Sequence, residues 1–319
     1  MSKCEILIQY GNTIYQPAVE EGVVWEAQRR KAAGKLTFTV LKDAALNFTE
    51  GNAVRFTYGG EKVFYGFVFS KQRSNNDEIK VICYDQLRYF KNKDTYVYEN
   101  KTATQLLRMV ANDFRLKLAR VADTKIALSA SEDNKELFDI VGNALDETTT
   151  ISGQSYVLYD EFGGLVLENI SNMKLDILID AETAQTYDYR SSIDSGTYNK
   201  IKLVYDNSET GKREVFIAQD SVNQNNWGIL QYFESLNSNV NGKAKADTLL
   251  KLYNRKARSL SIKDCAGDVR VRGGSLVPIM LNLGDVALGN YMLVENVKHT
   301  FKESEHTMTV QINGGDFSA

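Results

Sequence analysis

His299 and His306 are the only histidines in the chain, so a histidine acid–base centre or a multi-histidine metal site has almost no material. Both fall in the last predicted hairpin, which we expect to turn at Glu303 and Ser304. Antiparallel pairing about this turn places both histidines on the apolar face, where we expect them to be packed and half-buried rather than catalytic. The register predicts three cross-strand pairs: Phe301 with His306, His299 with Met308 and Val297 with Val310.

Carboxylates are the second group that could do chemistry, since paired aspartates and glutamates cleave glycosidic bonds. The chain holds 41 acidic residues, and Asp160 with Glu161, or Asp264 with Asp268, could form such a pair. These carboxylates lie close to glycines in predicted loops, where acidic side chains are usually solvated turn residues. We therefore expect no hydrolytic site.

The other sequence motifs of enzymes and metal sites are missing. Cys4, Cys83 and Cys265 are widely spaced and lack a CxxC pattern, so they predict neither a disulfide framework nor a zinc site. The sequence has no glycine-rich phosphate loop, nucleophile elbow or metal-binding helix motif. Trp25 and Trp227 could stack on a sugar, although packing in a core or an interface explains them equally well. We expect no catalytic residue, no cofactor, no metal and no enzymatic activity.

Composition and charge narrow the class of partner. The formal net charge is −3, which gives no electrostatic footprint for sequence-specific nucleic-acid binding. No stretch approaches the roughly 20 apolar residues of a membrane span, so we expect no membrane insertion. A length of 319 residues predicts about two ordered domains, and 17 tyrosines with 14 phenylalanines favour β-sheet.

A three-strand meander from Gly51 to Tyr84 is the strongest structural pattern. Its first strand alternates apolar and polar residues, and Gly59 and Gly60 supply a turn before the second. A two-residue turn would pair Phe56 with Val63 and Val54 with Tyr65, whereas a three-residue turn would pair Phe56 with Phe64. The third strand should bury one face, formed by Ile79, Val81 and Cys83.

The same order of patterns returns near the C-terminus, which predicts a duplicated β domain. The alternative is that any two antiparallel meanders look alike. Five matches support the duplication: Gly51 to Val54 with Gly274 to Val277, the strand through Gly66 with Asn290 to Phe301, Glu78 to Tyr84 with Glu305 to Ile312, Ile6 to Tyr10 with Ile201 to Tyr205, and Leu36 to Thr39 with Leu260 to Lys263.

Between the two copies the hydrophobic period becomes helical. Thr102 and Gln105 have the spacing of a capping box, and an apolar stripe follows at Leu107, Val110, Ala111, Phe114 and Leu118. A second helix is expected from about Asn134, and a short hairpin from Ser155 to Glu168. We predict a mainly β chain with an α+β middle module and two similar antiparallel β-barrel (tube-like) domains. Residues 1–100 form the first barrel, 101–170 the middle module and 171–319 the second barrel, with a helical insertion at about 242–258.

Several of these runs resemble baseplate hub proteins of contractile phage tails, of the type found in PBSX-like prophages and in R-type bacteriocins. The resemblance covers most of the chain and is weakest over about 119–135 and 206–240. It consists of hydrophobic and turn patterns, so it implies a fold and an assembly role and no chemistry. The runs are Gly66 to Ser70, Cys83 to Asp94, Asn100 to Thr104, Asn290 to Phe301 and Glu305 to Met308.

What this resemblance implies is a homotrimer that forms a pseudo-sixfold ring and joins the tail-tube protein to the spike protein, in contact with other baseplate proteins. Such a protein belongs to the baseplate of a virion or tail-like particle assembled in the bacterial cytoplasm. The alternative is a carbohydrate-binding or glycoside-hydrolysing β protein.

Overall fold

In the computed structural model the chain divides into two compact units. Unit 1 comprises Met1–Tyr187 and Ser261–Ile312, and unit 2 comprises Asp188–Leu260 and Asn313–Ala319. The structure describes residues 4–73, 77–184, 186–194, 196–207, 211–236, 241–284 and 286–314.

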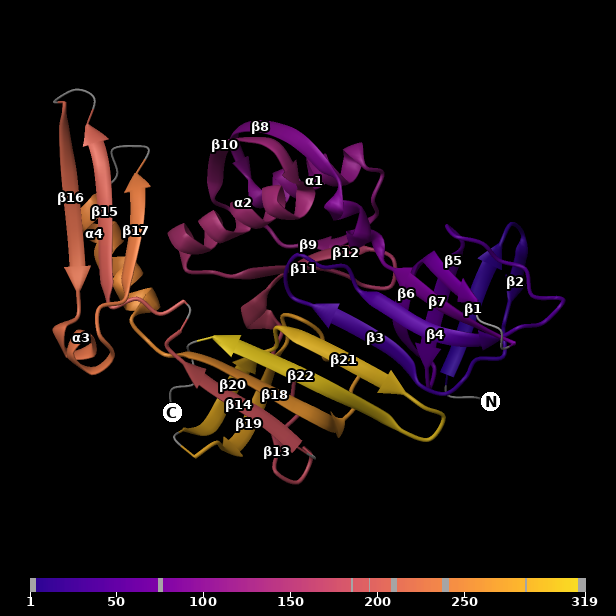
Figure 1. The fold of residues 1–319 in the computed structure, drawn as a ribbon. Coiled ribbons are helices and arrows are strands. Elements are labelled where there is room, and N and C mark those ends of the chain that lie inside the picture. Colours follow the sequence, from indigo (N-terminus) through magenta and orange to yellow (C-terminus); the bar gives the residue numbers. More distant parts are fainter. Residues whose placement is uncertain are drawn as a thin grey trace. The chain divides into compact units, whose positions relative to one another are not determined.

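The N-terminal part of unit 1 is one antiparallel sheet with the strand order β3-β4-β7-β6-β5-β1-β2 (Figure 1). We call β1 and β3 to β7 the first repeat. The third strand of the predicted meander buries one face as expected. The strands are β1 (Cys4–Tyr10), β2 (Thr13–Tyr15), β3 (Val23–Gln28), β4 (Lys35–Leu41), β5 (Ala53–Tyr58), β6 (Glu61–Arg73) and β7 (Glu78–Tyr84).

The hairpin of β5 and β6 combines the two registers that the sequence left open. Its turn is the two-residue one, because Tyr58 pairs with Glu61. A β-bulge on β6 then shifts the ladder by one residue, so that Phe56 pairs with Phe64. The number of residues in the turn does not predict this bulge.

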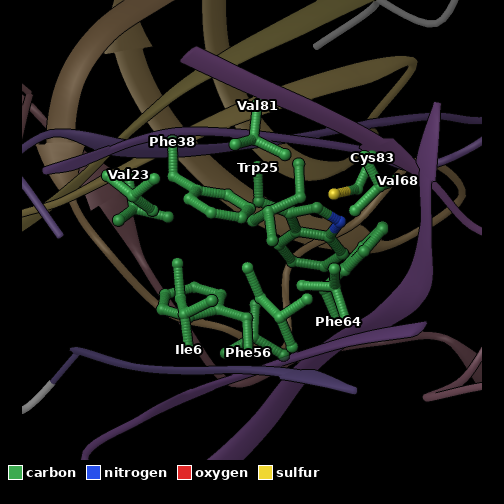
Figure 2. Packing of buried hydrophobic residues seen from close by; sticks show 14 of the residues in the cluster. Ile6, Val23, Trp25, Phe38, Phe56, Phe64, Val68, Val81 and Cys83 are labelled. Atoms are coloured by element: carbon green, nitrogen blue, oxygen red, sulfur yellow. The ribbon is translucent and has the colours of Figure 1, made fainter. Parts of the chain in front are cut away.

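The hydrophobic core of the first repeat lies inside its curved sheet. Figure 2 shows Ile6 and Phe56, from β1 and β5, pointing towards Phe38 and Val81, from β4 and β7. The expectation of closed barrels is wrong for the described residues, although the mainly β class is confirmed. The sheet stays open because β3 is paired on both edges, by β4 and by the C-terminal strand β21, and has no free edge for β1 or β2.

The C-terminal strands repeat this arrangement of neighbours, and we call them the second repeat. Their order is β14-β18-β22-β21, followed by a separate sheet β13-β19-β20. β14, β18 and β22 hold the places of β3, β4 and β7. β20 and β21 hold the places of the two halves of β6, while β19 stands for β5 and β13 for β1. The strands are β13 (Ile179–Asp180), β14 (Thr186–Ser192), β18 (Ala257–Ala266), β19 (Leu276–Asn282), β20 (Ala287–Leu293), β21 (Asn296–Phe301) and β22 (His306–Gly314).

One of the predicted matches needs correction here. The stretch Ile201 to Tyr205 is not the counterpart of Ile6 to Tyr10, because it lies in the strand β15 of a different sheet. The strand in the corresponding place is β13, which pairs with β19 in parallel, whereas β1 pairs with β5 in antiparallel. Both mismatched stretches bury aliphatic residues at alternate positions, Ile6 and Ile8 in one and Ile201 and Leu203 in the other, so the sequence pattern could not separate them.

The middle of unit 1 packs two helices against two small sheets. The capping box of Thr102 and Gln105 is confirmed at the start of α1. Phe114 and Leu118 lie beyond that helix and are half-buried. The second helix begins at Leu137, later than expected, because strand pairing continues to Glu136. The elements are η1 (Gln86–Lys91), β8 (Lys93–Thr102), α1 (Ala103–Asp113), β9 (Leu118–Val121), β10 (Ala127–Glu136), α2 (Leu137–Ser152), β11 (Tyr156–Asp160), β12 (Leu165–Asn169) and η2 (Ile170–Asn172).

Unit 2 contains a three-stranded sheet, β16-β15-β17, with a helix packed on one face. The helix expected at 242–258 is α4, which ends at Tyr253. Its apolar side packs on Ile201 and Leu203 of the sheet, so the helix belongs to a unit with its own core. The elements are β15 (Lys200–Asn207), β16 (Lys212–Gln219), α3 (Ser221–Trp227), β17 (Gln231–Leu236) and α4 (Gly242–Tyr253). The domain limits 1–100, 101–170 and 171–319 remain a prediction.

Candidate functional site

The two repeats share one backbone hydrogen-bond pattern at the point where their meanders begin. In the first repeat, Gly51 N donates to Val68 O (2.8 Å) and Val68 N donates to Asn52 O (2.9 Å). In the second, Gly274 N donates to Val294 O (2.8 Å) and Val294 N donates to Ser275 O (2.9 Å). Gly51 and Gly274 both have a positive φ, of 87° and 98°, which glycine adopts at little cost. The predicted match of these glycines is confirmed.

The copies differ in how the chain continues past this point. In the first repeat, β6 runs on through a bulge near Val68 and pairs with β7. In the second repeat the equivalent stretch is divided into β20 and β21, which belong to different sheets. The stretch Asn290 to Phe301, which the sequence pattern matches with the strand through Gly66, is therefore two strands in the second copy. The backbone turns from one ladder to the other between Val294 and Glu295, because Glu295 N donates to Gln311 O.

The two repeats meet where β21 pairs with β3 in antiparallel, and Figure 1 shows these strands side by side. We call this ladder, with the side chains that line it, the repeat interface. It contains six residue pairs, from Asn296 with Gln28 to Phe301 with Val23. The bond from Arg29 N to Glu295 O (2.8 Å) extends it at one end.

Side chains strengthen the repeat interface at one end and in the middle of the ladder. Arg29 donates from Nε and Nη2 to the two carboxylate oxygens of Glu295, at 2.9 and 2.6 Å. Their side chains are only 12% and 17% exposed, so this bidentate pair is more strongly held than a surface ion pair. Trp25 stacks on His299 with ring centroids 4.9 Å apart. Gly273 lies so close to the end of β3 that an added Cβ would meet the backbone nitrogen of Arg29 at 2.2 Å.

The two histidines form a hydrogen-bonded pair inside this interface, and their predicted register is confirmed in all three cross-strand pairs. His299 Nε2 lies 2.9 Å from Val271 O, so it carries the hydrogen. In the neutral ring Nδ1 then accepts from His306 Nε2–H, at 2.9 Å. Burial lowers the pKa of His299 to about 3 and that of His306 to about 4. The rings are therefore neutral at neutral pH and act as packing groups.

A buried polar junction lies beside the repeat interface and joins three parts of unit 1. Asp85 follows β7, Asp160 ends β11, and Arg272 precedes β19. Asp85 accepts from the backbone nitrogens of Gly34 (2.8 Å) and Leu87 (2.9 Å). Burial, with the charge of Asp160, raises the pKa of Asp85 well above its usual range, and burial also raises the pKa of Asp160.

Arg272 supplies the positive charge of this junction. Its guanidinium lies 4.5 Å from the ring centroid of Tyr159 and 5.7 Å from that of Trp25. Its Nη1 donates to Asp160 O at 3.1 Å. Burial lowers the pKa of Arg272, while the nearby carboxylates oppose that shift. The cavity at this junction measures only about 20 Å³, which is room for a water molecule and not for a substrate.

The carboxylates considered for hydrolysis are not brought together as the proposed pairs. Asp160 lies in the buried junction, whereas Glu161 forms an ion pair with Arg120 at 3.0 Å. Asp268 pairs with Arg270 at 2.8 Å. Asp264 is exposed at a position with φ of 53°. Trp25 is only 4% exposed and cannot stack on a sugar.

The described residues hold no cluster of three or more histidine, cysteine, aspartate or glutamate side chains that could bind a metal ion. Cys83 and Cys265 are buried, and burial raises the pKa of both thiols. Within the same described ranges, no helix is both long and apolar enough to span a bilayer. The arrangement seen is one of packing and strand pairing.

Sequence reasoning missed Arg29, Glu295, Gly273 and Arg272, although each has a central place in the interface or the junction. A signal for one of them existed, since Gly273 stands directly beside the glycine that marks the second repeat. The others are charged residues in loops, which by type alone are indistinguishable from solvated ones.

The fold is of the class seen in phage tail proteins. The solved 43 kDa tail protein of prophage MuSo2 from Shewanella oneidensis superposes with a TM-score of 0.70. The match covers 97% of this chain and 96% of that chain at 15% sequence identity. The likeness concerns the whole fold.

Sequence comparison gives the family. The YqbQ-like family model matches residues 23–313, and the chain belongs to this family. It is 29% identical over 309 residues to the uncharacterized protein YqbQ of Bacillus subtilis (strain 168), covering 92% of both chains. It is 27% identical over 312 residues to the phage-like element PBSX protein XkdQ of the same organism, covering 94% of both. The resemblance to PBSX-like prophage proteins is confirmed.

Proposed function

We propose that this protein is a structural subunit of the baseplate hub of a contractile tail-like particle. In this proposal three copies close a pseudo-sixfold ring that joins the tail tube to the spike. The ring contacts the tail-tube protein, the spike protein and other baseplate proteins, within a virion or tail-like particle assembled in the bacterial cytoplasm. The protein acts through its surfaces and catalyses no reaction.

The observation that carries this proposal is the pairing of two like repeats within one chain. A ring of six tube subunits and a threefold spike have different symmetries. Three copies of a chain with two similar β domains present six near-equivalent units and still obey threefold symmetry. The shared hydrogen bonds at Gly51 and Gly274 and the antiparallel contact of β3 with β21 give two such units a defined arrangement.

Two further observations support a structural role. The solved tail protein of a prophage has the same fold over nearly the whole chain. The buried polar junction at Asp85 and Arg272 holds three parts of unit 1 together and has no room for a substrate.

Particles purified from a strain that expresses a tagged copy test the proposal. The tagged protein is expected in intact particles, at three copies per tail tip by quantitative mass spectrometry. Its absence from particles, or six copies per tip, would refute the hub assignment. Turnover of peptidoglycan or of a glycoside by the pure protein, lost in an Asp160→Asn variant, would favour the carbohydrate-active alternative.

A further inference from the structure

The repeat interface joins two strand edges, one from each repeat. Because the repeats are alike, each of them should carry a counterpart of both edges. Within the chain, the first repeat contributes the outer edge of β3 and the second contributes the outer edge of β21. Two further edges are not used in this contact: the counterpart of β21 in the first repeat and the counterpart of β3 in the second. These are the distal half of β6 and the strand β14.

The distal half of β6 is an open edge in the described structure. β6 pairs with β5 up to Val68 and with β7 from Phe67 onwards. From Phe69 to Arg73 it pairs only with β7. The open edge of this half of β6 lies on the side away from β7. In the second repeat the same side of β21, away from β22, pairs with β3. Ser70, Gln72 and Arg73 are exposed there.

The surroundings of the two edges also correspond. Phe48 stands three residues before Gly51 and Val271 three residues before Gly274, and both are buried. The carbonyl of Phe48 accepts from Lys71 Nζ at 2.7 Å, on β6. The carbonyl of Val271 faces His299 Nε2 at 2.9 Å, on β21. Each loop is thus hydrogen-bonded to the corresponding strand in its repeat.

The strand β14 ends the order of its sheet, next to β18, as β3 stands next to β4. The first position of an open sheet has one unpaired row of backbone groups, which can receive another strand. The side chains of Thr186, Asp188 and Arg190 are exposed, whereas Val23 and Trp25 of β3 are buried. Charged side chains such as these are usual on the edge strand of a sheet.

We propose that β14 of one copy of this chain pairs in antiparallel with the distal half of β6, Phe69 to Arg73, of a second copy, and so repeats between chains the contact that β3 and β21 make within one. The contact joins two different edges, so it is heterologous and closes into a ring when the rotation allows. This inference rests on the proposed function, for which it names the subunit contact. The partner is a second copy of this chain.

Disulfide trapping between single-cysteine variants tests the pairing, because neighbouring strands bring opposed residues within disulfide reach. One set carries Ser70→Cys or Gln72→Cys, and the other carries Asp188→Cys, Arg190→Cys or Ser192→Cys. All are made in a Cys4→Ser background, since the other two native thiols are buried. Variants are mixed in pairs, oxidised both as concentrated protein and in particle preparations, and resolved without reductant.

Two of the cysteine pairs are expected to give a disulfide-linked dimer as the main product. Because the strands are antiparallel, the linked positions should run in opposite order along β6 and β14. Whichever residue of β14 links to Gln72→Cys, Ser70→Cys should link to the residue two positions further along. The matched control is Ile14→Cys, which is 56% exposed on β2 at the opposite end of the same sheet and should not link to β14 variants.

Native mass spectrometry alongside keeps this result separate from the proposed function. Trimers that form without these links overturn the edge assignment and leave the hub proposal standing. Links no stronger than those of the Ile14→Cys control overturn the edge assignment as well. Reversed-order links that yield a covalent trimer when both cysteines are in one chain support both.

Discussion

Replacing Gly273 by alanine should weaken the repeat interface more than any other one-carbon change there. The added Cβ would lie 2.2 Å from Arg29 N and 2.4 Å from Gln28 C. Both are backbone atoms at the end of β3, so no flexible side chain can move aside. The loop and the strand must separate by about 1 Å to reach ordinary contact.

The expected cost has two parts. Overpacking of a tight site costs about 1 to 3 kcal/mol. Separation also weakens the bond from Arg29 N to Glu295 O (2.8 Å), which adds about 1 kcal/mol. We therefore expect Gly273→Ala to lower the free energy of unfolding of this part of the chain by about 2 to 4 kcal/mol.

Urea unfolding followed by tryptophan fluorescence measures this cost. Trp25 lies in the interface, and a Trp227→Phe background makes it the sole reporter. Gly289→Ala in β20 is the matched control, because its Cβ would meet no atom within 4 Å. The control should be neutral or gain up to about 1 kcal/mol, since glycine is unfavourable inside a strand. Equal unfolding midpoints for the two variants would refute the close approach of the repeats.

Three further perturbations have defined outcomes. Unfolded histidines titrate near pH 6.5, whereas burial lowers the pKa of the folded pair to about 3 and about 4. The free energy of unfolding should therefore fall as pH decreases from about 6.5 to 4. The slope is up to about 1.4 kcal/mol per pH unit for each histidine. A His306→Gln variant should show a shallower pH dependence in the same denaturation assay, and an unchanged slope would contradict the burial of the pair. Arg272→Met should cost about 1 to 3 kcal/mol because it leaves the carbonyl oxygen of Asp160 without its donor. Arg270→Met at an exposed ion pair should cost under about 1 kcal/mol. Thermal unfolding of both variants gives the comparison. Leu107→Ala, at a fully buried position of α1, should cost about 2 to 5 kcal/mol by urea unfolding and leave the mass of the assembled protein unchanged.

The sequence predicted those parts of the fold that short-range patterns determine. The capping box at Thr102, the meander from Gly51 and the last hairpin depend on residues close together in the chain, and all three are observed. The buried histidines followed from the register of that hairpin. Residue types alone do not show which side chains meet, and the carboxylates that are close in sequence have separate partners in the structure.

The sequence could not predict which distant strands pair. β3 and β21 lie more than 250 residues apart, and nothing in their patterns names the other as neighbour. The false match of Ile201 to Tyr205 arose because any strand with one buried face has the same alternation. Arg29, Glu295 and Arg272 are covered by residues distant in the chain, so their role depends on tertiary structure.

An image reconstruction of the particle's tail tip at a resolution that separates β-strands is the most direct test of the hub proposal. We expect one ring of three copies, with six β domains at near-equal angular spacing and the first and second repeats in alternation. A ring of six copies, or a ring wall that contains only one of the two repeats, would contradict it.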